Sequence, residues 1–214
     1  GGLVTIGHDA DASDSTDNSD STANADFAFD NESPAHRVHL EPFELASRPI
    51  RNGEFAAFIA DGGYERPELW LSEGWAMLSE TNWRAPLYWG RREDAPQEDR
   101  WAHFTLGGLR PLRMEEPVGH VSLFEADAFA RWAGCRLPTE AEWELAATAG
   151  TDGKRSYPWG EDEPDRNHAN MDGRALGVID VGGRAEGDSI HGMRERIGNV
   201  WVWPDTNFEP YPGS

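Results

Sequence analysis

Short segments of regular apolar spacing, separated by glycines and prolines, set the main constraint on how this chain can fold. The 214 residues include 23 glycines and 14 prolines, the residues that most often end helices and strands. After Gly150 the sequence predicts mostly turns, with one short strand at 177–181 (GVIDV). Few helices among many turns indicate an irregular α+β architecture. The length fits a single domain.

Acidic residues outnumber basic ones by 39 to 19, which gives a formal charge of −20. Nucleic acid is itself densely anionic, so this charge argues against a nucleic-acid partner. No run of about 18 apolar residues occurs, and the first ten residues contain neither the basic nor the apolar part of an export signal. The sequence therefore predicts no membrane partner.

Cys135 is the only cysteine, which excludes an internal disulfide, a cysteine metal cluster and a redox pair. A reducing compartment, the cytoplasm, is the expected location. Lys154 is the only lysine. An acid-rich surface with almost no lysine is typical of a high-salt habitat, and equally of a GC-rich genome.

Residues 9–26 consist almost wholly of Asp, Ser, Thr, Asn and Ala. Such a segment cannot bury enough apolar surface to offset the entropy of ordering it. We expect a disordered acidic insertion. A calcium-binding loop is the alternative, although the glycine turn and terminal glutamate of an EF-hand are missing.

Strands are predicted at 3–8, at 36–45, as a pair within 101–112, and at 116–121 before a helix. The histidines His36 and His39 lie three residues apart. On a strand of period two they face opposite sides, so they form a poor metal pair.

Two capping boxes predict where helices begin. Ser122 with Glu125, and Thr139 with Glu142, have the spacing at which the hydroxyl and the carboxylate each satisfy a free backbone amide. The acids Glu140, Glu142 and Glu144 resemble a general acid/base set. Acids in a first helical turn are explained equally by the helix dipole, and we favour that interpretation.

Phe55, Phe58 and Ile59 form one apolar stripe at helical spacing, which predicts a core helix. Glycines at Gly62, Gly134 and Gly150 are expected to end the predicted helices.

Ten tryptophans and nine phenylalanines supply enough apolar area for a core. Trp70, Trp75, Trp83 and Trp89 are crowded into one segment, 64–89, between prolines. We expect them to pack a loop-rich body. A sugar site or a cage for a cation is the alternative.

Four motifs occur together in a fixed order: RLPTEAEWELAA at 136–147, YPWG at 157–160, HANMDG at 168–173 and GNVWVW at 198–203. This series resembles the formylglycine-generating, sulfatase-modifying domain, a variant of the C-type-lectin-like fold. The resemblance implies one such domain over residues 1–214, with an irregular α+β fold. It leaves the activity open, because one fold hosts several functions.

A second series is similar to the C-terminal domain of ergothioneine-biosynthesis sulfoxide synthases: DGGYERPELWLSEGW at 61–75, WRAPLYW at 83–89, HVSLFEADAFARWAG at 120–134, and the segment 187–214. Those enzymes join a thiol, cysteine or γ-glutamylcysteine, to hercynine with non-haem iron and dioxygen. The resemblance implies that this chain is the substrate-lining part of such an enzyme, truncated at both ends.

In that family the iron(II) ligands are three histidines of an N-terminal DinB-like domain with an H-x-x-x-H spacing. None of the seven histidines here has that spacing. The resemblance therefore implies that iron is held by a domain outside this chain, and that these residues alone are inactive.

The resemblance makes Tyr211, in the P-Y-P-G segment at 210–213, the candidate catalytic residue, donating a proton or hydrogen bond to the iron-bound oxygen species. A phenol stays protonated at neutral pH and suits that role. The alternative is an aromatic plug on the surface. Val202 stands where the sulfatase-modifying branch has a calcium-binding glutamate, which leaves a structural calcium near Asn170 and the Met171 carbonyl only weakly supported.

Two other functions stay open. A formylglycine-generating oxidase uses a copper-binding cysteine pair, and only Cys135 is present; a small buried packing role is expected for it. A non-catalytic lectin-like binding module would instead place exposed tryptophans around a cleft.

Overall fold

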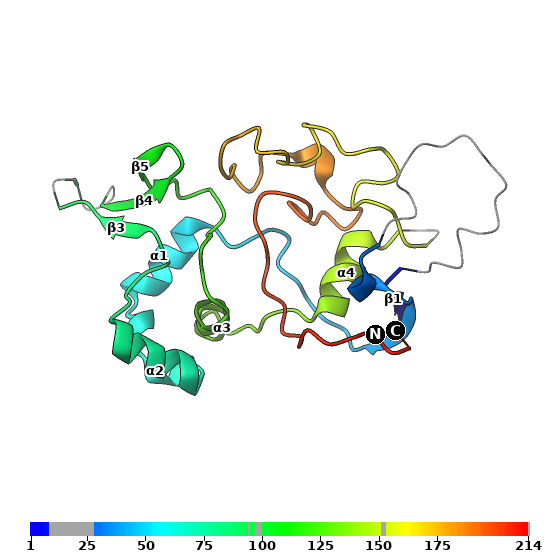
Figure 1. Ribbon diagram of the computed structural model, residues 1–214, viewed down its shortest axis with the longest axis horizontal. Coiled ribbons are helices and arrows are strands. Elements are labelled where there is room, and N and C mark those ends of the chain that lie inside the picture. The colour runs from blue at the N-terminus through cyan, green and yellow to red at the C-terminus, as the bar shows by residue number, and fades with distance from the viewer. Residues whose placement is uncertain (9–27, 94, 97–99, 151–152, 214) are drawn as a thin grey trace.

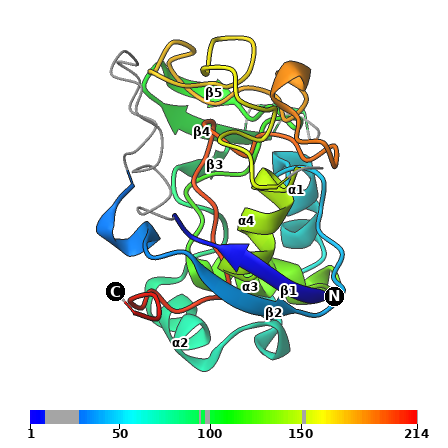
Figure 2. The same cartoon turned by 90° about the vertical axis from the view of Figure 1, so that its right-hand side faces the viewer.

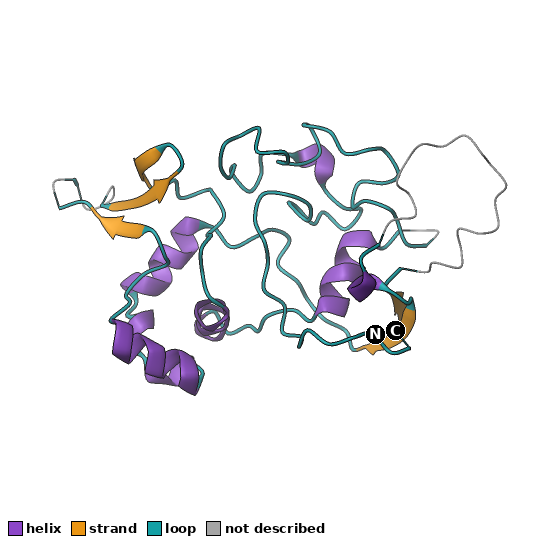
Figure 3. Cartoon of the chain, viewed as in Figure 1, coloured by secondary structure: helices purple, strands orange, loops and turns teal. Residues whose placement is uncertain are grey.

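The computed structural model describes residues 1–8, 28–93, 95–96, 100–150 and 153–213. Helices and strands are short and loops connect most of the chain (Figure 3). The predicted insertion at 9–26 lies outside the described residues. The helices are α1 (Asn52–Ala60), α2 (Ser72–Thr81), α3 (Leu123–Trp132) and α4 (Glu140–Thr148). The strands are β1 (Gly2–Ile6), β2 (His36–Leu40), β3 (Trp89–Arg91), β4 (Trp101–Thr105) and β5 (Gly108–Pro111).

The elements gather at two ends of an elongated molecule (Figure 1). Helices α1, α2 and α3 lie at one end with strands β3 to β5. Helix α4 lies at the other end with β1, β2 and both chain termini. Four short 3₁₀ turns occur within the described residues, at Asp30–Glu32, Gly63–Glu65, Pro67–Leu69 and Ala185–Gly187. The family-like irregular α+β fold is confirmed.

Both sheets are antiparallel. Strands β1 and β2 pair with Leu3 opposite His39 and Ile6 opposite His36, and α4 packs behind them (Figure 2). The second sheet has the order β3-β4-β5, with Trp89 opposite His103. The predicted strand pair in 101–112 is confirmed.

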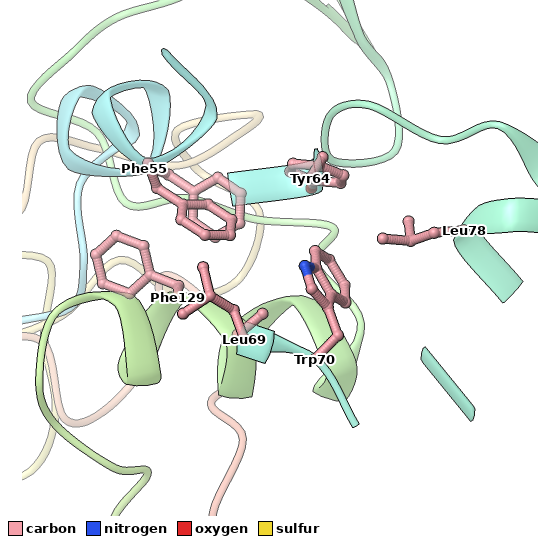
Figure 4. Close-up of a cluster of buried hydrophobic side chains, with 8 residues drawn as sticks. Phe55, Tyr64, Leu69, Trp70, Leu78 and Phe129 are labelled. Carbon is pink, nitrogen blue, oxygen red and sulfur yellow. The ribbon is translucent and has the colours of Figure 1, made fainter. Parts of the chain in front are cut away.

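The main core is aromatic and lies between α1 and α3 (Figure 4). The Phe58 ring is fully buried and packs against five aromatic rings, with the centroids of Phe55, Tyr64, Phe129 and Trp132 within 6 Å and that of Trp70 at 6.5 Å. Edge and tilted contacts of this kind add to the free energy of area burial. The apolar stripe that the sequence placed on this helix is therefore core, as predicted.

Glu125 connects this core to the start of α3. Its Oε2 accepts hydrogen bonds from the Ser122 amide at 2.7 Å and the Ser122 hydroxyl at 2.9 Å. Its Oε1 accepts the buried hydroxyl of Tyr64 at 2.5 Å. Thr139 and Glu142 form the second capping box on α4. Both predicted helix starts are confirmed.

Only one of the two later glycine stops has the expected conformation. Gly134 has a φ of +71°, the left-handed region that follows a helix end. Gly150 does not; its amide instead donates to the Gly153 carbonyl at 2.7 Å.

Several predicted strands are wrong. The strand expected over 36–45 ends at Leu40, one residue before the Glu41-Pro42 pair. The segments 116–121 and 177–181 are loops, held by single backbone bonds such as the Val118 amide to Ile50 and the Val181 amide to Glu115. Helix α2 lies in the tryptophan-rich segment that we expected to be irregular.

No helix in the described part of the chain is long and apolar enough to cross a membrane.

We expect Phe58→Ala to lower the free energy of unfolding by about 3–5 kcal/mol, because it opens a cavity at the centre of the aromatic core. Leu106→Ala is the matched control: Leu106 is 95% exposed, and its loss should change stability by no more than about 0.5 kcal/mol. Urea unfolding followed by tryptophan fluorescence measures both. Equal effects would contradict this description of the core.

Candidate functional site

Tyr211 packs against α4 and the β1–β2 hairpin. Its hydroxyl donates to Glu140 Oε1 at 3.2 Å, and its ring meets the His36 ring edge-on at a centroid distance of 4.5 Å. Burial and the negative charge of Glu140 raise the pKa of the Tyr211 phenol. The phenol therefore stays protonated and able to donate at any physiological pH.

The three acids at the start of α4 have separate partners. Glu142 forms a two-point ion pair with Arg136, at 2.6 and 2.8 Å, and also accepts the Thr139 amide at 2.8 Å. Glu144 holds the Lys154 ammonium at 2.6 Å and the Gly7 amide at 2.9 Å. The structural interpretation fits these contacts, although ion pairs contribute as well as the helix dipole.

The Arg136 guanidinium, together with the Thr139 amide and hydroxyl, lowers the pKa of Glu142 to about 2. In an unfolded chain a glutamate has a pKa of about 4.3. The charged form is therefore favoured in the folded state. Its contribution to stability is complete above about pH 4.3 and is lost as the pH falls toward 2.

We predict that Glu142→Gln lowers the free energy of unfolding at pH 7 by about 1–3 kcal/mol, and that the difference from wild type shrinks as the pH falls from 5 toward 2. The exposed Glu80, on α2, supplies the control variant Glu80→Gln, which should show neither effect. Urea unfolding across this pH range tests it. A difference that stays constant with pH would refute the assignment.

Metal-ligand side chains do not gather in the described residues: no three of His, Cys, Asp or Glu are close enough to share an ion. His36 and His39 lie on opposite faces of β2, opposite Ile6 and Leu3 respectively. The donor set of this part of the chain does not fit an iron(II) centre, which needs several such ligands on one side of an open position.

The candidate calcium residues already have hydrogen-bond partners: Asn170 is bonded to Asn199, and the Met171 carbonyl accepts the Arg174 amide at 3.3 Å. Asn199 Oδ1 accepts both the Asn170 Nδ2 amide, at 3.1 Å, and the Ile179 backbone amide, at 2.9 Å. The Asn199 backbone amide donates to the Asn170 carbonyl at 3.1 Å. Calcium needs six to eight oxygens turned toward it. Here the oxygens face N–H groups, so the arrangement fastens two loops together and does not fit a calcium site.

Cys135 is exposed, which corrects the expected buried packing role. It follows Gly134, whose left-handed conformation turns the chain away from the core after α3. Its thiol donates to the Ala133 carbonyl at a distance of 3.6 Å.

The tryptophans of 64–89 divide into two groups. Trp70 is buried and donates to the Gly63 carbonyl at 2.8 Å, and Trp75 packs against the same core. Trp83 and Trp89 line an open pocket of about 690 Å³ beside the β3–β4–β5 sheet, and Trp89 also packs against the core, edge-on to Phe55. The packing prediction is confirmed for the first group.

Glu195 is a residue that sequence reasoning missed. It is 8% exposed, and neither carboxylate oxygen has a hydrogen-bond partner of normal geometry among the described residues, although the nearby Asn199 side chain acts to lower its pKa. Burial, and to a smaller extent Asp188, raise the pKa of Glu195 to about 7, against the lowering effect of Arg184. The run Arg194-Glu195-Arg196 is typical of a solvated surface, so no local signal indicated burial.

Raising a carboxyl pKa makes the folded state bind more protons than the unfolded state above about pH 4.3. Stability is then lost as the pH rises from 4.3 toward 7. We expect Glu195→Gln to raise the free energy of unfolding by about 2–4 kcal/mol at pH 8 and to change it little at pH 4. The exposed Glu186→Gln is the control. Destabilisation at pH 8 would show that Glu195 is paired.

Comparison with known families decides what kind of domain this is. The family model of the sulfatase-modifying factor enzyme 1-like domain matches residues 1–213. The chain belongs to this family.

Named relatives fall into two groups within it. Hercynine oxygenases of Mycobacterium tuberculosis and Mycolicibacterium thermoresistibile are 39% and 40% identical over 87% and 89% of this chain. The chain spans less than half of their length, 43% and 42%. A formylglycine-generating enzyme of Mycobacterium tuberculosis is 33% identical over 86% of this chain and 70% of its own length.

Proposed function

We propose that this chain is the C-terminal, substrate-lining domain of a longer non-haem-iron sulfoxide synthase. The reaction would join cysteine or γ-glutamylcysteine to hercynine with dioxygen, in ergothioneine biosynthesis. The observation that carries the proposal is the higher identity to hercynine oxygenases, 39–40%, than to formylglycine-generating enzymes, 32–33%. The small share of those oxygenases that it matches favours a second domain.

The partner domain in this proposal is an N-terminal DinB-like bundle that holds iron(II). The iron would activate dioxygen when bound there. The residues described in this chain do not fit an iron centre, so their part is to bind and orient hercynine and the thiol and to exclude water. A cytoplasmic location belongs to the same proposal, with no nucleic acid or membrane as partner.

Tyr211 is the residue that we propose for proton donation toward the reacting oxygen. Its raised pKa supports a phenol that keeps its proton until a stronger base takes it. In this chain its hydroxyl donates to Glu140. The proposed role requires the hydroxyl to exchange that acceptor for one presented by the iron-bearing domain.

The second candidate, a formylglycine-generating oxidase, is favoured by the match to 70% of such an enzyme's length. The lower identity to such enzymes, 32–33% against 39–40% for the hercynine oxygenases, counts against it. A non-catalytic module is the third, since a mouse relative with 30% identity is named an inactive C-alpha-formylglycine-generating enzyme.

One assay separates these candidates. The longer parent protein, reconstituted with iron(II), is given hercynine, dioxygen and either thiol, and products are read by mass spectrometry. A thioether-sulfoxide of hercynine is expected. A parallel reaction offers a cysteine-containing sulfatase peptide; its conversion to formylglycine, without hercynine turnover, would refute the proposal in favour of the oxidase.

Tyr211→Phe in that parent protein is expected to shift the products from the hercynine sulfoxide toward oxidised thiol, because the phenol's proton is lost while the ring is kept. Tyr157→Phe is the matched control, because it also removes a phenol hydroxyl, but from a ring that stacks on Trp159 at 5.3 Å and has no proposed part in the reaction. The ratio of the two products measures the effect. If Tyr211→Phe gave the same ratio of sulfoxide to oxidised thiol as the wild type, Tyr211 would have only a packing role.

A further inference from the structure

One pocket of this acid-rich chain is bordered by arginines that have no acidic partner. Arg84 and Arg91 line the pocket of about 690 Å³. In the part of the chain that the structure describes, neither forms an ion pair, although acids outnumber bases two to one and arginines such as Arg48, Arg113 and Arg136 are paired. Both side chains are exposed, and although Arg84 Nη1 donates to the Trp83 carbonyl at 2.6 Å, each guanidinium keeps N–H donors for an anion.

The sheet register adds to this positive charge. Arg91 lies opposite Trp101, and the next pair on the same face is Trp89 opposite His103. His103 in turn lies opposite Arg110 on β5. Burial, and to a smaller extent the charges of His120 and Arg110, lower the pKa of His103, so the positive charge on this face comes from the arginines.

Aromatic rings form the rest of the pocket. The Arg91 guanidinium lies over the Trp101 ring, 4.8 Å from its centre. Stacking of this kind leaves the N–H donors in the guanidinium plane free to form two parallel bonds to an oxyanion. Trp83 is 37% exposed and Tyr88 is 50% exposed with a φ of +70°. This φ is uncommon for a bulky residue, and residues 83–89 all line the pocket.

We propose that this pocket binds a small planar carboxylate, an aromatic or heteroaromatic acid whose carboxylate meets Arg84 and Arg91 and whose ring packs on the exposed indoles. This inference is independent of the proposed reaction. The pocket volume is in the range of small-molecule sites.

The same lining argues against other ligands. A cage for a cation would be opposed by two unpaired guanidinium groups. A ligand with several carboxylates would be opposed by Glu65, which also lines the pocket. A ligand with a single carboxylate and one planar group avoids both the repulsion of a cation by the arginines and the repulsion of further carboxylates by Glu65.

Isothermal titration calorimetry of the full chain with benzoate tests the proposal, and uncharged benzamide is the isosteric control. We expect saturable binding of benzoate, with benzamide at least ten-fold weaker. Arg84→Gln and Arg91→Gln should each weaken benzoate binding about ten-fold or more. Arg37→Gln, which removes an exposed charge on β2, should leave it within two-fold.

Thermal unfolding verifies that each variant is folded, and Arg91→Lys, which keeps the charge but loses the planar fork, should bind benzoate with intermediate affinity. Inorganic phosphate is a further probe. No binding of benzoate, equal binding of benzamide, binding of phosphate as tight as that of benzoate, or equal losses in Arg37→Gln would each overturn the proposal.

Discussion

The buried carboxylate of Glu125 caps the start of α3 and also binds Tyr64 in the aromatic core, and the rest of the structure depends on both interactions. One oxygen satisfies free donors of Ser122 at the start of α3, and the other accepts the hydroxyl of Tyr64 inside the aromatic core. A buried carboxylate is costly unless every lone pair is used. Because its partners come from both sides of the core, the 3₁₀ turn at Gly63–Glu65 and α3 are held in one relative position.

Local patterns in the sequence predicted those features whose cause is local. Capping boxes depend on residues three apart, and the strand pair of β4 and β5 depends on a two-residue turn, so both were found. Longer-range causes were missed. The burial of Glu195 is imposed by distant segments, and the exposure of Cys135 follows from the direction of the chain after Gly134. Neither leaves a periodic signal.

The candidate site shows the same difference between features with local causes and features with long-range causes. The motif order indicated the family, which residues 1–213 confirm, because motifs are local. It could not show that Tyr211 contacts Glu140, 71 residues away, or that Trp83 and Trp89 share a pocket with Arg91. Under the proposed function, loops held by a few buried contacts would line the substrates, and the metal would be held by a neighbouring domain.

Iron binding by the chain itself tests this division of labour most directly. The 214 residues and the longer parent protein are each dialysed against iron(II) without oxygen, and the iron retained per chain is measured by elemental analysis. The account predicts about one iron per chain for the parent, through an H-x-x-x-H segment, and no stoichiometric iron for the 214 residues alone. One tightly held iron per 214-residue chain would contradict it.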